Sequence, residues 1–159
     1  MLGFFKGKSK DNIIYSPCKG KVVPITEVSD PTFSEKVLGD GFAVIPSEGK
    51  IYAPADGEIS MVFDTLHAVT MTTSQGTELL IHIGLDTVTL KGEPFISHVS
   101  GGQQVKKGDL LLEADLEKIK SAGLDTITPV LTCNTDDYNK INLIKEGEVS
   151  IDDEVLKIS

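Results

Sequence analysis

The sequence predicts an all-β fold, an antiparallel β-sandwich or barrel-like domain with a duplicated half-motif and a few short helices. From Ile13 onward, short β-branched runs alternate with Gly, Pro and Asp at regular intervals, which is typical of antiparallel β-proteins. Two pairs of segments also resemble each other, residues 16–23 with 53–60 and residues 102–112 with 147–156. In the first pair a Pro-x-x-Gly turn leads into a strand, and in the second a polar turn precedes a closing strand. We interpret this similarity as a duplicated β half-motif.

The individual elements follow from local patterns. The expected strands are residues 21–25, 41–45, 50–53, 58–63, 63–71, 78–88 and 109–114. Short helices are expected over residues 30–38 and 115–122, because Asp30 and Asp115 are suited to cap a helix N-terminus. Residues 136–145 are expected to form a third short helix or an irregular segment.

Length and charge limit the domain organisation and the class of partner. A chain of 159 residues can bury one sizeable core, so we expect a single domain at residues 13–159 after a flexible tail at residues 1–12. The net charge is −9 and all 15 basic residues are lysine. This balance argues against nucleic acid and favours a basic protein as partner.

The sequence also predicts a cytoplasmic location. No apolar run approaches the ~20 residues of a membrane span, and no secretory signal is recognisable. Leu2, Phe4 and Phe5 in the tail give it at most a weak contact with a membrane surface. Cys18 and Cys133 are isolated in the sequence and are expected to be ordinary free thiols.

Two histidines stand out in a predicted hairpin. His82 lies near the centre of residues 78–88, and His67 lies in residues 63–71, with a turn-like Ser-Gln-Gly between the two runs. Alternation places Leu79, Ile81, Ile83 and Leu85 on one face and Glu78, Leu80, His82 and Gly84 on the other. His82 therefore points away from the main apolar row.

The register of this hairpin decides whether the histidines meet. A loop of Ser74 and Gln75 makes His67 and His82 direct cross-strand neighbours, with Cβ atoms about 5 Å apart. A loop of Gln75 and Gly76 makes them diagonal neighbours on the same face. An odd offset from a bulge is expected to separate them.

Three kinds of chemistry suit such a pair. His82 can accept a phosphoryl group while His67 donates an N–H to it, with Thr65 fixing the tautomer of His67. Alternatively, both histidines and Asp86 can hold zinc, or the pair can be structural within a binding module. The sequence lacks a Ser or Cys nucleophile motif, a P-loop and a dinucleotide fingerprint. Residue chemistry alone leaves the phosphoryl and zinc interpretations open.

A resemblance to a known family separates these alternatives. The run Thr65-Leu-His67, residues 79–88 and Leu90-Lys-Gly-Glu93 closely resemble the IIA domain of the glucose family of the bacterial phosphoenolpyruvate:sugar phosphotransferase system. Residues 33–41, 53–57, 104–109 and 128–130 extend the resemblance over most of the chain.

The resemblance implies a phosphotransferase component that takes a phosphoryl group from the phosphocarrier protein HPr and passes it to a cysteine of a IIB domain. It implies that His82 is phosphorylated, that His67 is the second active-site histidine, that Thr65 supports His67 and that Asp86 is a nearby acidic residue. The implied apolar rim for partners consists of Phe33, Leu38, Phe63, Leu80 and Val88. No cofactor is required, and zinc on His67 and His82 would need a ligand from a partner such as a regulatory target protein.

Overall fold

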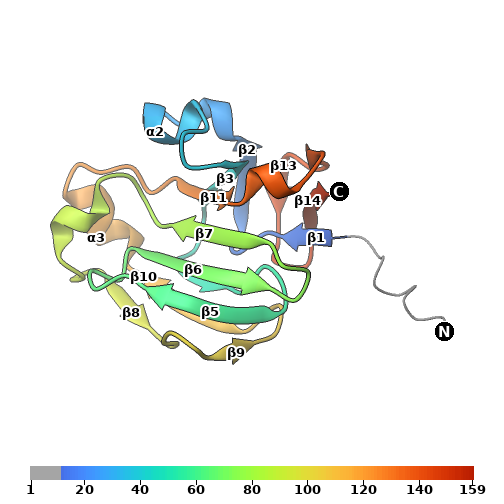
Figure 1. Cartoon of the computed structure of the whole chain (residues 1–159). Helices are drawn as coiled ribbons and strands as arrows, with labels where there is room; N and C mark the ends of the chain where they lie inside the picture. Colours follow the sequence, from blue (N-terminus) through green and yellow to red (C-terminus); the bar gives the residue numbers. More distant parts are fainter. Residues whose placement is uncertain (1–11) are drawn as a thin grey trace.

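Three antiparallel sheets build the protein in the computed structural model, which describes residues 12–159 (Figure 1). The strands of the large sheet are β2 (Gly20–Pro24), β3 (Asp40–Pro46), β5 (Gly57–Val62), β6 (Ala68–Thr73), β7 (Glu78–His82), β9 (Gln104–Val105), β11 (Thr128–Thr132) and β13 (Gly147–Val149). Their order is β13-β2-β3-β11-β7-β6-β5-β9. The expected tail and its weak membrane contact lie outside the described residues.

Two smaller sheets complete the described fold. One contains β1 (Asn12–Tyr15), β14 (Glu154–Ile158) and β12 (Ile141–Leu143) in that order, and the other contains β4 (Lys50–Tyr52), β10 (Leu110–Ala114) and β8 (Phe95–Ser97). The prediction of an antiparallel β-sandwich with few helices is confirmed. Strand β1 begins at Asn12, one residue before the expected start of the domain.

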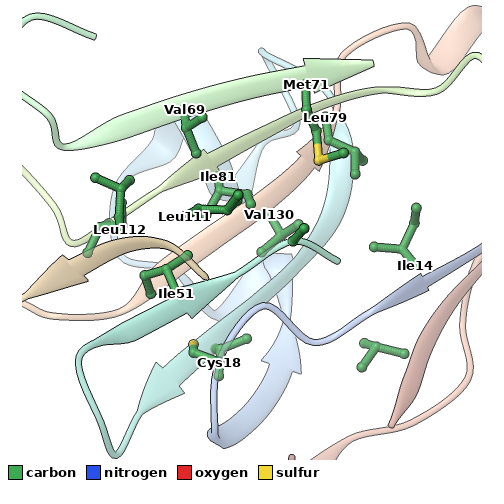
Figure 2. Packing of buried hydrophobic residues seen from close by; sticks show 14 of the residues in the cluster. Ile14, Cys18, Ile51, Val69, Met71, Leu79, Ile81, Leu111, Leu112 and Val130 are labelled. Carbon is green, nitrogen blue, oxygen red and sulfur yellow. The ribbon is translucent and has the colours of Figure 1, made fainter. Parts of the chain in front are cut away.

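The two faces of the large sheet bury different clusters. Along β7, Leu79 and Ile81 enter the main core, where they meet side chains of the small sheets such as Leu111 (Figure 2). Leu80 points to the opposite face and joins a second cluster with Leu131 of β11. Because strand side chains alternate between faces, neighbouring residues of β7 support two separate apolar layers.

The duplicated half-motif is visible in the sheet topology. Strands β4 to β10 form one half, which is inserted between β3 and β11 of the other half. The halves meet in the middle of the large sheet, where Ile81 of β7 pairs with Val130 of β11. Gly20 and Gly57 begin equivalent strands, and at each a Cβ atom would collide with the carbonyl oxygen of the neighbouring strand. The two Pro-x-x-Gly segments thus use glycine for the same reason.

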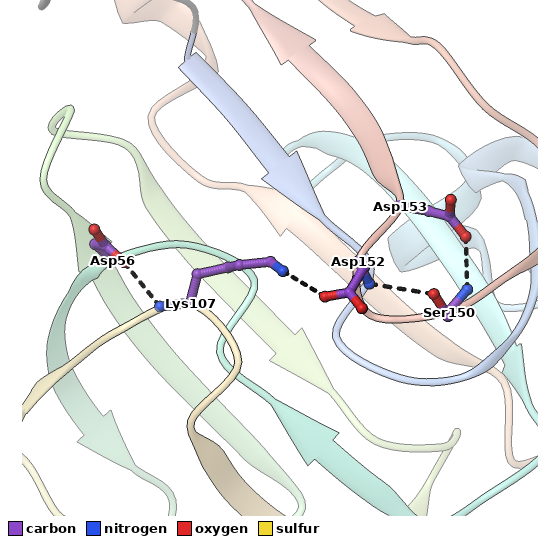
Figure 3. A network of polar contacts seen from close by, with 5 residues as sticks. All are labelled: Asp56, Lys107, Ser150, Asp152 and Asp153. Atoms are coloured by element: carbon purple, nitrogen blue, oxygen red, sulfur yellow. Dashed lines mark hydrogen bonds and ion pairs between the residues drawn. The ribbon is translucent and has the colours of Figure 1, made fainter.

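Matching turns also link the halves to each other. The Asp109 carboxylate accepts a hydrogen bond from the Lys106 amide, and the Asp153 carboxylate accepts one from the Ser150 amide, both at 2.8 Å. Lys107 bridges the two turns through an ion pair with Asp152 at 2.9 Å (Figure 3). The Asp152 side chain is largely exposed, so we expect the pair to stabilise the fold by less than about 1 kcal/mol.

The helical segments are shorter than expected. Helices α2 (Pro31–Ser34) and α3 (Leu116–Ser121) begin after Asp30 and Asp115, whose carboxylates accept hydrogen bonds from first-turn amides as predicted. The described residues also form the 3-10 turns η1 (Ile25–Glu27), η2 (Thr87–Leu90) and η3 (Thr135–Asp137). Of the two alternatives expected for residues 136–145, a short helix or an irregular segment, the helix was wrong. The 3-10 turn η3 ends at Asp137, and β12 follows within an otherwise irregular stretch. Within residues 12–159, no helix is long and apolar enough to cross a membrane.

Candidate active site

The histidine hairpin adopts a register that the sequence analysis did not favour. Strand β6 pairs with β7 so that Ala68, not His67, lies opposite His82. The loop consists of residues 74–76, and Gly76 has a left-handed backbone with φ 89°. A three-residue hairpin loop that ends in such a glycine is a common alternative to the two-residue loops. Both favoured registers were therefore wrong.

The histidines nevertheless touch, because His67 precedes the regular strand. Strand β5 ends at Val62, and a tight turn carries the chain through residues 63–67, so the strand expected over residues 63–71 begins only at Ala68. Leu66 in this turn has a left-handed backbone with φ 59°. The ring centroids of His67 and His82 lie 4.9 Å apart at an interplanar angle of 83°. The expectation that an odd offset separates the rings was wrong.

A second turn ends β7 directly after His82. Gly84 has φ 79°, and an added Cβ would lie 2.6 Å from Thr87 Cγ2 and 2.9 Å from the Asp125 carbonyl oxygen. Glycine is required here by both conformation and space. The turn also breaks the alternation of the strand, so Leu85 joins the second cluster with Leu80 rather than the main apolar row, where it was expected.

Hydrogen bonds orient each imidazole through its Nδ1 atom. His82 Nδ1 lies 2.7 Å from the carbonyl oxygen of Gly84. Because a carbonyl can only accept, Nδ1 of His82 carries the hydrogen and Nε2 of the neutral ring retains a lone pair. His67 Nδ1 lies 2.6 Å from Thr65 Oγ1, a hydroxyl that can donate or accept.

The rings open into a shallow, mostly apolar depression of about 310 Å³. Phe33 packs against His82 with centroids 5.0 Å apart and ring planes tilted by 58°, and Phe63 meets His67 edge-on at 5.4 Å. The lining residues are Asp30, Thr32, Phe33, Leu38, Phe63, His67, Leu80, His82, Asp86 and Val88. All five residues of the implied rim therefore border this one depression, although Phe33 and Leu80 are almost fully buried.

Comparison with known proteins decides the family. The family model described as phosphoenolpyruvate-dependent sugar phosphotransferase system, EIIA 1, matches residues 12–138. The chain belongs to this family. The resemblance recognised in the sequence is thereby confirmed.

Relatives of two kinds share this EIIA region. The glucose-specific EIIA component of Halalkalibacterium halodurans is 50% identical over 127 residues, covering 80% of this chain and 73% of that protein. The beta-glucoside-specific EIIBCA component of Bacillus subtilis is 46% identical over 147 residues, covering 92% of this chain. The chain spans 24% of the length of that relative. The solved glucose permease IIA of Mycoplasma capricolum superposes with a TM-score of 0.87 at 36% identity, covering 98% of this chain and 99% of that one.

Burial keeps both imidazoles of this EIIA chain neutral. Burial, followed by the proximity of His82, lowers the pKa of His67 from 6.5 to about 4. Burial also lowers the pKa of His82, opposed by its hydrogen bond to Gly84 and by the carboxylates of Asp30 and Asp86. A neutral imidazole retains the lone pair that nucleophilic attack requires.

Two lining residues of the EIIA site were missed in the sequence. Asp30 was interpreted only as a helix cap, and Thr32 was not singled out, yet both border the depression. Asp30 could have been assigned to the site from the sequence. As the cap of α2 it must lie near Phe33, which was already assigned to the rim. What could not be read from the sequence is that this segment folds back over His82.

The structure does not place Asp86 as the third zinc ligand that the sequence analysis considered. Within the part of the chain that the structure describes, no three His, Cys, Asp or Glu side chains are grouped so that they could hold a metal ion. Asp86 borders the depression but does not complete such a group with His67 and His82. A structural zinc site needs four ligands, and a catalytic one usually has three from the protein.

Proposed function

We propose that this chain is a phosphocarrier that accepts a phosphoryl group from phospho-HPr on Nε2 of His82. It then transfers the group to a cysteine of the IIB domain of a glucose-type permease. The observation that carries the proposal is the hydrogen bond between His82 Nδ1 and the Gly84 carbonyl, which leaves Nε2 as the free nucleophile. Membership of the EIIA family supports the direction of transfer.

Each transfer exchanges one bond to phosphorus for another. The Nε2 lone pair of His82 attacks phosphorus as the N–P bond of phospho-HPr breaks, and its electrons return to the donor imidazole. In the second transfer a cysteine thiolate attacks the same phosphorus, and the Nε2–P electron pair returns to His82. Phosphoryl transfer of this kind depends mainly on alignment and charge stabilisation.

His67 supplies the charge stabilisation in this proposal. If the Thr65 hydroxyl donates to His67 Nδ1, the Nε2 atom of His67 carries the hydrogen. The rings are close enough, at 4.9 Å between centroids, for this N–H to reach a phosphoryl group on His82. A preorganised donor of this kind stabilises charge that develops on the phosphoryl oxygens.

The surroundings suit a partner that docks and leaves. An apolar rim excludes water while the labile phosphoryl group is transferred. Asp30 and Asp86 at the depression, together with a net charge of −9, attract a basic carrier. Partnership with a IIB domain is supported by relatives named EIIBCA and EIICBA components, in which A, B and C parts belong to one protein. We place these exchanges in the cytoplasm.

The test is a reconstituted transfer. The chain is incubated with phosphoenolpyruvate, enzyme I and HPr, and then analysed for an acid-labile, base-stable phosphate. We expect one phosphate per chain, located on His82 by peptide mapping. Absence of transfer, with zinc retained stoichiometrically after purification, would instead favour a metal-binding or regulatory module built on His67 and His82.

A further inference from the structure

The turn that follows β7 sets the direction of the Gly84 carbonyl. This carbonyl belongs to the planar peptide group that joins Gly84 to Leu85. The amide of Leu85, on the opposite edge of the same plane, donates to the Asp125 carbonyl oxygen at 3.0 Å. Since the C=O and N–H of a trans peptide point in opposite directions, this bond helps to aim the Gly84 carbonyl at His82.

The peptide group on the other side of Gly84 is held by Thr87. The Thr87 hydroxyl donates to the Ile83 carbonyl oxygen at 2.6 Å. Thr87 and Ile83 are both fully buried, so water cannot replace this donor. The Thr87 methyl group lies 2.6 Å from the position of an added Cβ on Gly84, so it also restricts the space into which the turn could relax.

Thr87 therefore controls one of the two peptide planes that determine the φ and ψ angles of Gly84. We propose that Thr87 is a positioning residue for phosphoryl transfer: it fixes the turn whose carbonyl holds His82 in the tautomer with a free Nε2 atom. This inference rests on the proposed function. It assigns Thr87 no contact with the phosphoryl group.

The consequence for chemistry follows from the two tautomers of neutral imidazole. When the Gly84 carbonyl accepts from Nδ1, the lone pair lies on Nε2. When that carbonyl is free to turn away, the tautomer with hydrogen on Nε2 becomes populated, and the nitrogen that attacks phosphorus is blocked. At metal sites, loss of a hydrogen-bond partner that orients a ligating histidine typically costs about 10- to 100-fold in affinity or activity, and we use the lower end of this range for His82.

Two substitutions and a matched control test the role of the hydroxyl. Thr87→Val keeps the shape and removes the donor, whereas Thr87→Ser keeps the donor and removes the methyl group. Thr89→Val is the control, since the exposed Thr89 hydroxyl donates to the Asp86 carbonyl oxygen at 2.7 Å in the same segment. Each chain is assayed for the rate of phosphorylation by phospho-HPr, and the His82 tautomer is read from imidazole ¹⁵N shifts at neutral pH.

The expected results separate this inference from the proposed function. For wild type we expect rapid phosphorylation and hydrogen on Nδ1 of His82. For Thr87→Val we expect about tenfold slower phosphorylation and a mixture of tautomers. Thr87→Ser should keep the wild-type tautomer and a rate above that of Thr87→Val, and Thr89→Val should match wild type in both measurements.

Several results would overturn the role of Thr87. An unchanged tautomer and rate in Thr87→Val would do so, as would an equal loss in Thr89→Val. If Thr87→Val failed to fold, a mixture of His82 tautomers in Thr87→Ser would overturn the role by itself, because that variant keeps the hydroxyl. A wild-type chain that has the expected tautomer but accepts no phosphate would contradict the proposed function and not the positioning of His82.

Discussion

The two halves of the large sheet have equivalent strand arrangements but carry different residues at equivalent positions. Counting outward from the central Ile81–Val130 pair, Leu131 holds the place in the outer half that His82 holds in the inserted half. Leu131 is fully buried in the second apolar cluster, whereas His82 lies at the edge of the same layer. Equivalent positions thus carry a packing residue in one half and, in the function proposed above, the phosphoryl acceptor in the other.

The connections explain why the site forms on one side only. In the outer half, the chain between β2 and β3 makes a long excursion through η1 and α2, which brings Phe33 against His82. In the inserted half, the equivalent connection between β5 and β6 is the tight turn that carries His67. The outer half therefore supplies Phe33 and Leu38 of the rim, and the inserted half supplies the two imidazole rings and the rest of the rim.

The largest expected effect comes from replacing His82. His82→Gln removes the accepting nitrogen, so phosphorylation by phospho-HPr should be abolished. Leu131→Gln alters the corresponding position of the other half and should reduce stability through burial of a polar group. Any molecules of that control that fold should still become phosphorylated. Normal phosphate uptake by His82→Gln would show that the reactive residue lies elsewhere.

Replacing His67 should impair a different step. His67→Gln keeps the acceptor on His82 and keeps an N–H donor, so phosphorylation by phospho-HPr should persist. Transfer onward to a IIB domain should be slower by about 100-fold, because the transition state loses the imidazole N–H of His67, which is positioned to donate to the phosphoryl oxygens. Single-turnover transfer to purified IIB measures this rate. Transfer at the original rate would contradict the role assigned to His67.

The sequence allowed much of the fold to be predicted, but not its central pairing. The duplicated Pro-x-x-Gly turns and the two capped helices depend on short-range chemistry and were recognisable. The sequence analysis did not predict β11, which contains Pro129, a residue without a backbone N–H donor. The strand tolerates this proline because its pairing with β7 begins only at Val130. A proline within a run normally argues against a central strand.

The site was predicted in composition better than in geometry. His67 and His82 were expected to meet as partners on paired strands. They meet instead because His67 lies in the turn at Leu66, just before β6 begins. The proximity of Asp30 and Thr32 depends on how the connection after η1 folds back, which no local pattern encodes. Tertiary packing determined these features.

The next prediction compares the residues that follow β7 and β11. Cys133 holds the place in the outer half that Gly84 holds in the inserted half, and its backbone is not left-handed. Gly84→Ala forces a Cβ into contact with Thr87 and Asp125, and should lower the free energy of unfolding by about 2 kcal/mol or more. Cys133→Ala should change it by less than about 1 kcal/mol. Urea unfolding of both variants would reveal whether the asymmetry is real.

Protonation of the buried His67 should make stability depend on pH. Burial, with a smaller contribution from His82, lowers the pKa of His67 to about 4, so the unfolded chain binds the proton more readily. The free energy of unfolding should therefore fall as pH decreases from about 6.5 toward 4, by roughly 2 kcal/mol at pH 4.5. His67→Gln should lose less stability than wild type over that range. Parallel pH profiles of the two proteins would exclude this contribution.

The smallest expected effect is zinc binding, which we expect at the histidines of the inserted half and not at the corresponding positions of the outer half. The inserted half offers two neutral imidazoles with centroids 4.9 Å apart, whereas the outer half has Asp40 and Leu131 at the corresponding positions. Two ligands leave zinc coordination incomplete, so we expect weak binding by the chain alone and tighter binding when a partner contributes a carboxylate. Phosphorylation of His82 should abolish binding, since it blocks a ligand nitrogen. Calorimetry at neutral pH tests this, and tight stoichiometric zinc in the unphosphorylated chain alone would mean that the pair forms a complete metal site.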